Sequence, residues 1–181
     1  MAFLRRPRAA IGIAILWAAL CPHLALAQRS AAEEQIKAVF LFNFAKYVDW
    51  PDAPAGTSAS IRMCVPANPQ FLAVLQTTVQ GEVVNGRPLT AMGLEGLDGA
   101  RECDILYVGN ASSRDAAAWS TAVRGRHTLT VGDGTLAEGI VIAFVRDQNR
   151  VRFDINRAAA GQQHLSISSR LLDLARRVVE P

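Results

Sequence analysis

The stretch from Glu33 to Pro51, EEQIKAVFLFNFAKYVDWP, constrains the fold more than any other part of the chain. Apolar residues recur there at helical spacing and fill most of the circumference of the expected helix, not one stripe. Lys46 near the end suits the helix dipole, and Pro51 is expected to stop the helix. Such a helix must be buried on several sides. It is either a central core helix or a core helix that also serves as an interface.

Residues 1–27 have the features of an export signal. A basic start is followed by an uncharged apolar run at 9–20 and by the small-x-small pattern of residues 25–27. We expect cleavage after Ala27, which leaves a periplasmic domain of residues 28–181 with no direct membrane insertion. An uncleaved anchor is the alternative, although the run is short and rich in alanine.

Removal of this segment changes the charge balance. Three of the 19 basic residues, Arg5, Arg6 and Arg8, lie in it, which leaves 16 basic and 16 acidic residues. A net charge near zero gives no basic footprint, so nucleic acid is not expected as a partner. The remaining 154 of the 181 residues fit one domain with its own core.

Two cysteines, Cys64 and Cys103, remain after the expected cleavage. An even count in an exported protein favours a disulfide, and a pair of buried free thiols is the alternative. Neither cysteine has a second ligand at close spacing, and His127 and His164 stand alone, so no metal site is expected.

Strand and helix patterns alternate along the rest of the chain. The patterns predict strands at 61–65, 103–108 and 127–131, a weak strand or hairpin at 83–89, and helices that begin after Asn68 and after Ser112 or Ser113. Residues 103–108, CDILYV, form a near-continuous apolar run that is typical of a strand covered on both faces.

The C-terminal third predicts a hairpin followed by helices. Residues 140–145 and 150–155 read as two strands joined at 147–149. Asn156 is expected to cap a short helix, residues 165–167 to form a last short strand, and Ser168 or Ser169 to cap an amphipathic helix that runs to Val178. The fold class is therefore α/β: a single domain, a mixed β-sheet with flanking helices, and a C-terminal β-hairpin plus helix.

No enzyme chemistry is evident in the sequence. The glycine turns at 109–110 and 132–134 match no phosphate-binding or dinucleotide fingerprint. The acidic residues Asp133, Glu138, Asp147 and Asp154 show no spacing for paired acid–base work, and we assign them to charged faces. We expect no catalytic residues and no cofactor.

A group of basic and hydroxyl residues near the last hairpin is a candidate anion or ligand site. Alternation places Arg150 and Arg152 on one face of their strand, and a helix start with serine hydroxyls follows. The alternative is a solvated strand face and an ordinary cap. The candidate residues are Arg150, Arg152, Asn156, Ser168, Ser169 and Arg170.

Several motifs in a fixed order resemble the YfiR-like family of periplasmic proteins. They are IKAVFLFNFAKYVDWP, CDILYVGNAS, VGDG with AEGIVIAFVRDQNRVRFDIN, and LSISSRLLDLAR, and the likeness runs from Ile36 to Val178. The resemblance implies that Cys64 and Cys103 form the structural disulfide of the family. It also implies a repressor that binds the periplasmic sensor region of a membrane diguanylate cyclase and lowers cyclic-di-GMP synthesis.

Two questions about binding stay open at this point. If the opening helix contacts the cyclase, its aromatic residues Phe40, Phe44 and Tyr47 are the candidate anchors, because aromatic side chains dominate interface energies. A homodimer is a further partner that the sequence leaves open. The alternative function is a periplasmic small-ligand-binding module that uses the arginine group.

Overall fold

A computed structural model describes residues 21–50 and 60–180 of the chain. Internal contacts divide the chain into two compact units, Met1–Glu34 and Gln35–Pro181. In the first unit, residues 21–34 are helical. Within the described residues, none of the helices combines the length and the apolar character needed to cross a bilayer. Most of the expected signal segment, residues 1–20, lies outside the described residues, so its cleavage stays a prediction.

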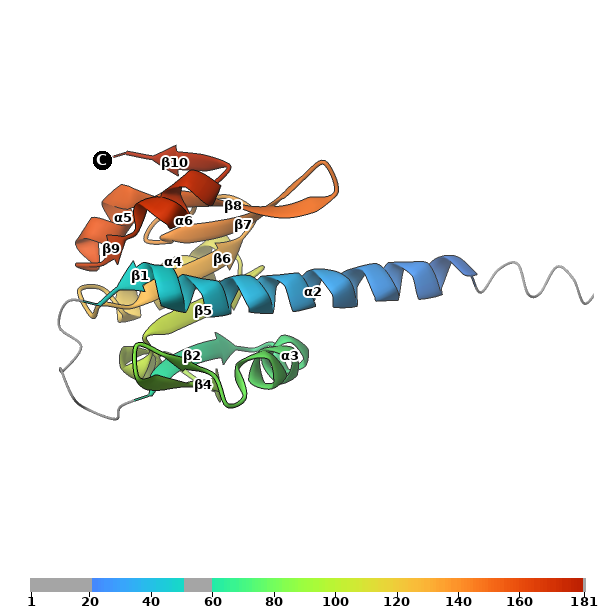
Figure 1. The fold of residues 1–181 in the computed structure, drawn as a ribbon, viewed down its shortest axis with the longest axis horizontal. Helices are drawn as coiled ribbons and strands as arrows, with labels where there is room; N and C mark the ends of the chain where they lie inside the picture. The colour runs from blue at the N-terminus through green and yellow to red at the C-terminus, as the bar shows by residue number, and fades with distance from the viewer. Residues whose placement is uncertain (1–20, 51–59, 181) are drawn as a thin grey trace, which may run out of the picture. The chain divides into compact units, whose positions relative to one another are not determined.

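The second unit is built on an eight-stranded mixed sheet with the order β10-β8-β7-β6-β5-β2-β4-β3, and β1 and β9 form a separate two-stranded ribbon (Figure 1). The pairs β7–β8 and β3–β4 are antiparallel, and the other neighbours in the large sheet are parallel. The elements are α2 (Cys21–Tyr47), β1 (Val48–Asp49), β2 (Ile61–Pro66), α3 (Pro69–Val79), β3 (Val83–Val84), β4 (Arg87–Leu94), the 3-10 helix η1 (Leu97–Glu102), β5 (Ile105–Gly109), α4 (Ser113–Ala122), β6 (Leu129–Asp133), β7 (Ile142–Asp147), β8 (Arg150–Asn156), α5 (Arg157–Gln162), β9 (Ser166–Ile167), α6 (Ser169–Leu174) and β10 (Arg177–Val179).

Alternation along the central strands produces two apolar cores, one on each face of the sheet. In β5, Ile105 and Tyr107 belong to the core that includes residues of α2 and α3, whereas Leu106 and Val108 belong to the core that includes residues of α4 and η1. Both faces of β5 are therefore covered, as its apolar run predicted. The expected α/β fold with a mixed sheet and flanking helices is confirmed.

The opening helix ends earlier than the sequence predicted. Helix α2 ends at Tyr47, and the next two residues pair with β9 in place of a further helical turn. The Ser168 amide also donates to the Tyr47 carbonyl over 3.0 Å. Backbone hydrogen bonds at the C-terminal end of α2 are thus made by a segment more than 100 residues later in the chain. Local helix propensity could not predict this contact.

The predicted hairpin and helix caps are confirmed. Strands β7 and β8 pair antiparallel from Ile142↔Ile155 to Asp147↔Arg150. Helices α3, α4, α5 and α6 each begin at a side-chain oxygen that accepts a backbone N–H in the first turn. These capping residues are Asn68 for α3, Ser112 for α4, Asn156 for α5 and Ser168 for α6.

The last predicted helix is wrong in its second half. Helix α6 ends at Leu174, and Val178 lies in β10, which pairs parallel with β8. The Arg176 amide donates to the Phe153 carbonyl over 2.8 Å, so the chain joins the sheet directly after α6. Strand β9 is consequently not the last strand of the protein. The residues predicted to form the second half of the amphipathic helix therefore form the edge strand β10, which contacts with β8 hold in place.

Candidate partner-binding site

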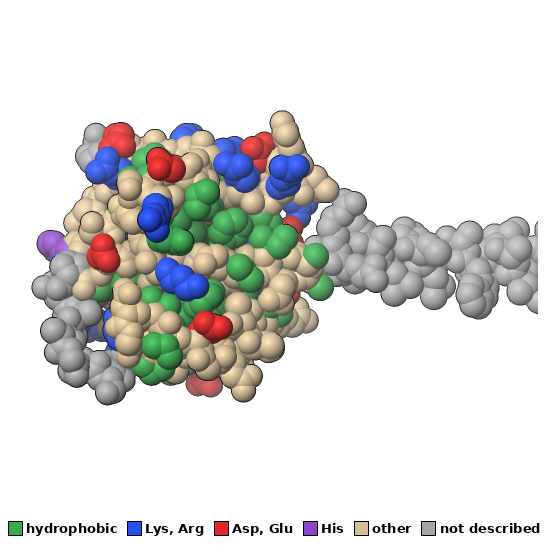
Figure 2. Space-filling model, in the orientation of Figure 1, with side chains coloured by type: hydrophobic (Ala, Val, Ile, Leu, Met, Phe, Trp, Pro, Cys, Tyr) green, Lys and Arg blue, Asp and Glu red, His purple; other side chains and the backbone are tan. Residues whose placement is uncertain are grey.

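From Lys37 to Ala45, helix α2 buries one face in the core, and it leaves a mainly apolar stripe on the other face. Ala38, Leu41 and Phe44 are fully buried in the core, while Ile36 and Val39 are 46% and 43% exposed. Ile36, Val39, Phe40 and Asn43 lie three or four positions apart and form the surface that we call the α2 stripe. Hydrophobic side chains gather on this face, over α2 and beside the β7–β8 hairpin (Figure 2). Exposed apolar groups that gather in this way are typical of a protein-binding surface.

The three predicted anchors have different environments. Phe44 is fully buried, so its assignment as a partner contact is wrong: its ring is a core side chain. Phe40 is partly buried, and its ring centroid lies 5.9 Å from that of Phe144 and 5.4 Å from that of Phe153. This packing fixes Phe40 at the border of the α2 stripe. Partner binding through Phe40 and the partly buried Tyr47 stays a prediction.

A largely buried ion pair ties α2 to the sheet. Lys37 Nζ lies 2.9 Å from Asp133 Oδ2, and the two side chains are only 10% and 9% exposed. The Tyr107 hydroxyl donates to the same oxygen over 2.9 Å. Asp133 Oδ1 is buried and has no hydrogen-bond partner in the described part of the chain. Because a lone buried charge is costly, this contact specifies which face of α2 turns inward.

The sequence interpretation of the carboxylates is wrong for Asp133 and Asp154. It places both on charged faces, but the structure holds each in an ion pair with its carboxylate largely out of solvent. A signal is present for the first pair: Lys37 is a charged residue that shares the buried face of α2 with Leu41 and Phe44. A lysine in such a position needs an acidic partner, although the sequence does not say which.

Comparison with known proteins identifies the family. The model of the YfiR/HmsC-like family matches residues 34–176, which is most of the chain. The chain belongs to the YfiR/HmsC-like family. Membership suggests a regulatory protein of the periplasm rather than a catalyst. No curated protein matches the chain.

A crystal structure of a conserved domain protein from Vibrio cholerae O1 biovar El Tor strain N16961 has a similar fold. The TM-score is 0.51 with 14% sequence identity, and the match covers 65% of this chain and 54% of the Vibrio chain. At this identity the likeness supports the α/β fold alone. The YfiR/HmsC-like chain thus spans about half the length of that solved chain.

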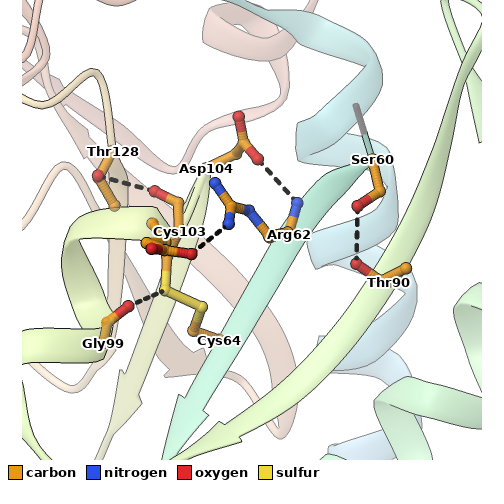
Figure 3. The surroundings of a disulfide bond; sticks show 9 residues. Ser60, Arg62, Cys64, Thr90, Gly99, Cys103, Asp104 and Thr128 are labelled. Carbon is orange, nitrogen blue, oxygen red and sulfur yellow. Dashed lines mark hydrogen bonds and ion pairs between the residues drawn. A yellow bond between two sulfur atoms is a disulfide. The ribbon is translucent and has the colours of Figure 1, made fainter. Parts of the chain in front are cut away.

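The predicted disulfide is confirmed and joins β2 to Cys103, the residue that caps the end of η1 (Figure 3). Cys64 and Cys103 have Cα atoms 5.9 Å apart and are 0% and 4% exposed. The Thr128 hydroxyl donates to the Cys103 carbonyl over 2.8 Å, and the Arg62 amide donates to Asp104 Oδ2 over 2.8 Å beside the bridge. A disulfide fits an oxidising compartment such as the periplasm.

Loss of this bond is expected to destabilise the protein by about 2–5 kcal/mol. The two cysteines are 39 residues apart, and a loop of that length corresponds to about 4 kcal/mol of chain entropy. We expect Cys64→Ala combined with Cys103→Ala to lower the urea midpoint of unfolding, and reductant to shift the wild type but not the double variant. An unchanged midpoint in the variant would contradict a stabilising role.

The arginine group does not form the single site that the sequence predicted. Arg150 and Asn156 lie at opposite ends of β8, about 20 Å apart at the usual rise per residue, so one small anion cannot contact both. The Asn156 and Ser168 side chains are occupied as helix caps. Arg150, Arg152, Ser169 and Arg170 are exposed, and a role for them in binding stays a prediction.

No group of three or more His, Cys, Asp or Glu side chains within residues 21–50 and 60–180 is placed to hold a metal ion.

A cluster of charged side chains around Asp154 has a structural role. Asp154, 1% exposed, accepts from Arg176 Nε over 2.8 Å and from Arg177 over 3.1 Å. These bonds join β8 to the chain that enters β10.

Acid is expected to weaken this cluster. The hydrogen bond from Arg176 lowers the pKa of Asp154; burial opposes this effect, and the charges of Arg176 and Arg177 support it. Because the folded-state pKa lies below the unfolded one, the stabilisation is complete above about pH 5 and is lost as pH falls below about 4. Asp154→Asn should therefore lower the urea midpoint at pH 7 by more than it does near pH 3. An equal loss at both pH values would contradict this assignment.

Proposed function

We propose that this YfiR/HmsC-like protein is a periplasmic regulator that binds the periplasmic region of a membrane diguanylate cyclase and represses cyclic-di-GMP synthesis. Family membership over residues 34–176 is the observation that carries the proposal. The buried disulfide supports a periplasmic location, since such bonds form in oxidising compartments.

The α2 stripe is the surface that we assign to the cyclase. It combines two exposed aliphatic side chains, Ile36 and Val39, with the ring of Phe40, which is held by Phe144 and Phe153. An aromatic side chain that is already fixed loses little conformational entropy on binding, which favours affinity. A partner that covers this stripe is expected to present an apolar segment.

The repressor role is tested in cells. Deletion of the gene should raise cyclic-di-GMP and biofilm formation, and the rise should disappear when the partner cyclase is deleted as well. Unchanged cyclic-di-GMP in the presence of an active cyclase would overturn the proposal.

The surface is tested with matched charge substitutions. Val39→Asp should leave the fold intact and weaken binding to the purified periplasmic region of the cyclase by at least about tenfold, as expected for an interface core residue. Val83→Asp is the control, because Val83 is also exposed (56%) but lies on β3 at the far edge of the sheet. Equal binding by the two variants would exclude the α2 stripe. A homodimer through the same stripe would appear as a doubled mass in light scattering that Val39→Asp removes.

The small-ligand function that uses the arginine group has less support. Arg150 and Asn156 lie too far apart to bind one small ligand together. The side chains of Asn156 and Ser168 are already used as helix caps. If Arg152 nevertheless contacts a partner, Arg152→Glu should abolish binding without a change in stability, because exposed charges usually contribute under about 1 kcal/mol.

A further inference from the structure

The sheet contains a point at which the direction of its connections reverses. Strands β2 and β5 are parallel neighbours, but the chain leaves β2 through α3 toward β4 on one side and leaves β5 through α4 toward β6 on the other. Where adjacent parallel strands diverge in this way, their carboxyl ends border a crevice, and α/β proteins commonly bind ligands there.

A cavity of about 350 Å³ lies at this point. The residues that follow β2 and β5 line it together with part of α4, and its volume is within the range of small-molecule sites. Ala67 in its rim has a φ of 51°, a left-handed conformation that is uncommon for alanine. Gly109, at the end of β5, has a φ of 56°. Backbone strain of the kind seen at Ala67 is found at ligand-binding sites as well as in turns.

The lining has one charge and an aromatic wall. Among the described residues around the cavity, Asp115 is the only charged side chain, and neither lysine nor arginine occurs there. Trp119 follows Asp115 by four positions, so both lie on the same face of α4. Tyr107 also borders the cavity, but its ring is almost fully buried and packs against Phe71 with centroids 4.4 Å apart. A carboxylate beside aromatic rings attracts organic cations.

The carboxylate is oriented and the neighbouring helix starts are occupied. The Ser112 hydroxyl donates to Asp115 Oδ2 over 2.7 Å, which holds the group in place. Helices α3 and α4 both begin at the cavity, but Asn68 and Ser112 already accept N–H groups from their first turns. Fewer backbone N–H groups are therefore free to bind an anion at these helix starts, whereas the Asp115 carboxylate can bind a cation.

We propose that this cavity binds a small organic cation, whose ammonium group lies between the Asp115 carboxylate and the Trp119 indole. The site is separate from the α2 stripe and does not depend on the regulatory function. It also differs in position and charge from the arginine group.

Thermal unfolding of the whole protein with choline chloride as the probe tests the site. At about 100 times its Kd, a ligand that binds only the native state should raise Tm by about 5–10 °C in a domain of this size. Sodium chloride at equal ionic strength should not do so. Asp115→Asn and Trp119→Leu should each abolish the choline shift.

Glu138→Gln is the matched control, because Glu138 is a carboxylate that lines a different cavity, between α4 and α5. It should retain the full choline shift. The unliganded Tm of each variant shows whether it folds, and Asp115→Asn decides the question if Trp119→Leu does not fold. The absence of a shift at millimolar choline, or a shift that survives Asp115→Asn, would overturn the proposal.

Discussion

Phe44→Ala is expected to lower the free energy of unfolding by about 3–5 kcal/mol, the usual loss for a buried phenylalanine. The Phe44 ring is fully buried, and its centroid lies 5.7 Å from that of Phe144 and 5.2 Å from that of Phe153. Truncation removes these contacts and leaves a cavity between α2 and the β7–β8 hairpin, which the surrounding side chains can fill only in part. Equilibrium unfolding in urea measures the loss.

Val39→Ala on the same helix is the control. Val39 is 43% exposed, so its truncation should change stability by no more than about 0.5 kcal/mol. The pair separates the inner face of α2 from the α2 stripe. Similar small losses for both variants would show that α2 is not docked through Phe44, and the assignment of its faces would have to be abandoned.

Lys37→Met is also expected to cause a large loss of stability, about 3–5 kcal/mol, because it leaves the Asp133 carboxylate largely buried without its cation. Asp133 Oδ1 already has no hydrogen-bond partner among the described residues, so the Tyr107 hydroxyl would have to hold this group without the lysine. The urea midpoint should fall accordingly.

The double variant Lys37→Met with Asp133→Asn should recover most of that loss. Both charges are then removed, and the amide oxygen introduced by Asp133→Asn can still accept from Tyr107. If the double variant is as unstable as the sum of the single variants, the two residues are not coupled, and the ion pair does not hold α2 in place.

The apolar pattern predicted the sheet far better than it predicted the surface. The run at 103–108 and the hairpin at 140–155 can be read locally, because burial on one face gives a period of two and burial on both faces gives a continuous apolar run. From Ile36 to Tyr47, apolar residues occupy most of the circumference of α2, so periodicity could not distinguish Phe44 in the core from Val39 outside it. That distinction depends on Asp133, which lies 96 residues beyond Lys37.

The C-terminal elements were mispredicted for a similar reason. Val178 continues the apolar spacing of Leu171 and Leu174, and the pattern alone therefore favours one helix. The bonds of Arg176 and Arg177 to Asp154 act across 22 and 23 residues and draw this segment onto β8. The cavity beside Asp115 and the divergence of the strands around it likewise depend on strand order, which no local motif encodes.

The short strand β10 also limits edge-to-edge pairing of the sheet with the sheet of a second chain. It covers the outer backbone groups of β8 only at Asp154, Ile155 and Asn156, and the remainder of β8 lies at the margin of the sheet. An open strand of this kind can template pairing with a second chain. Arg150 and Arg152 occupy that open part, and charged side chains there discourage such pairing. Release of β10 from Asp154 in acid would therefore be expected to promote aggregation together with unfolding.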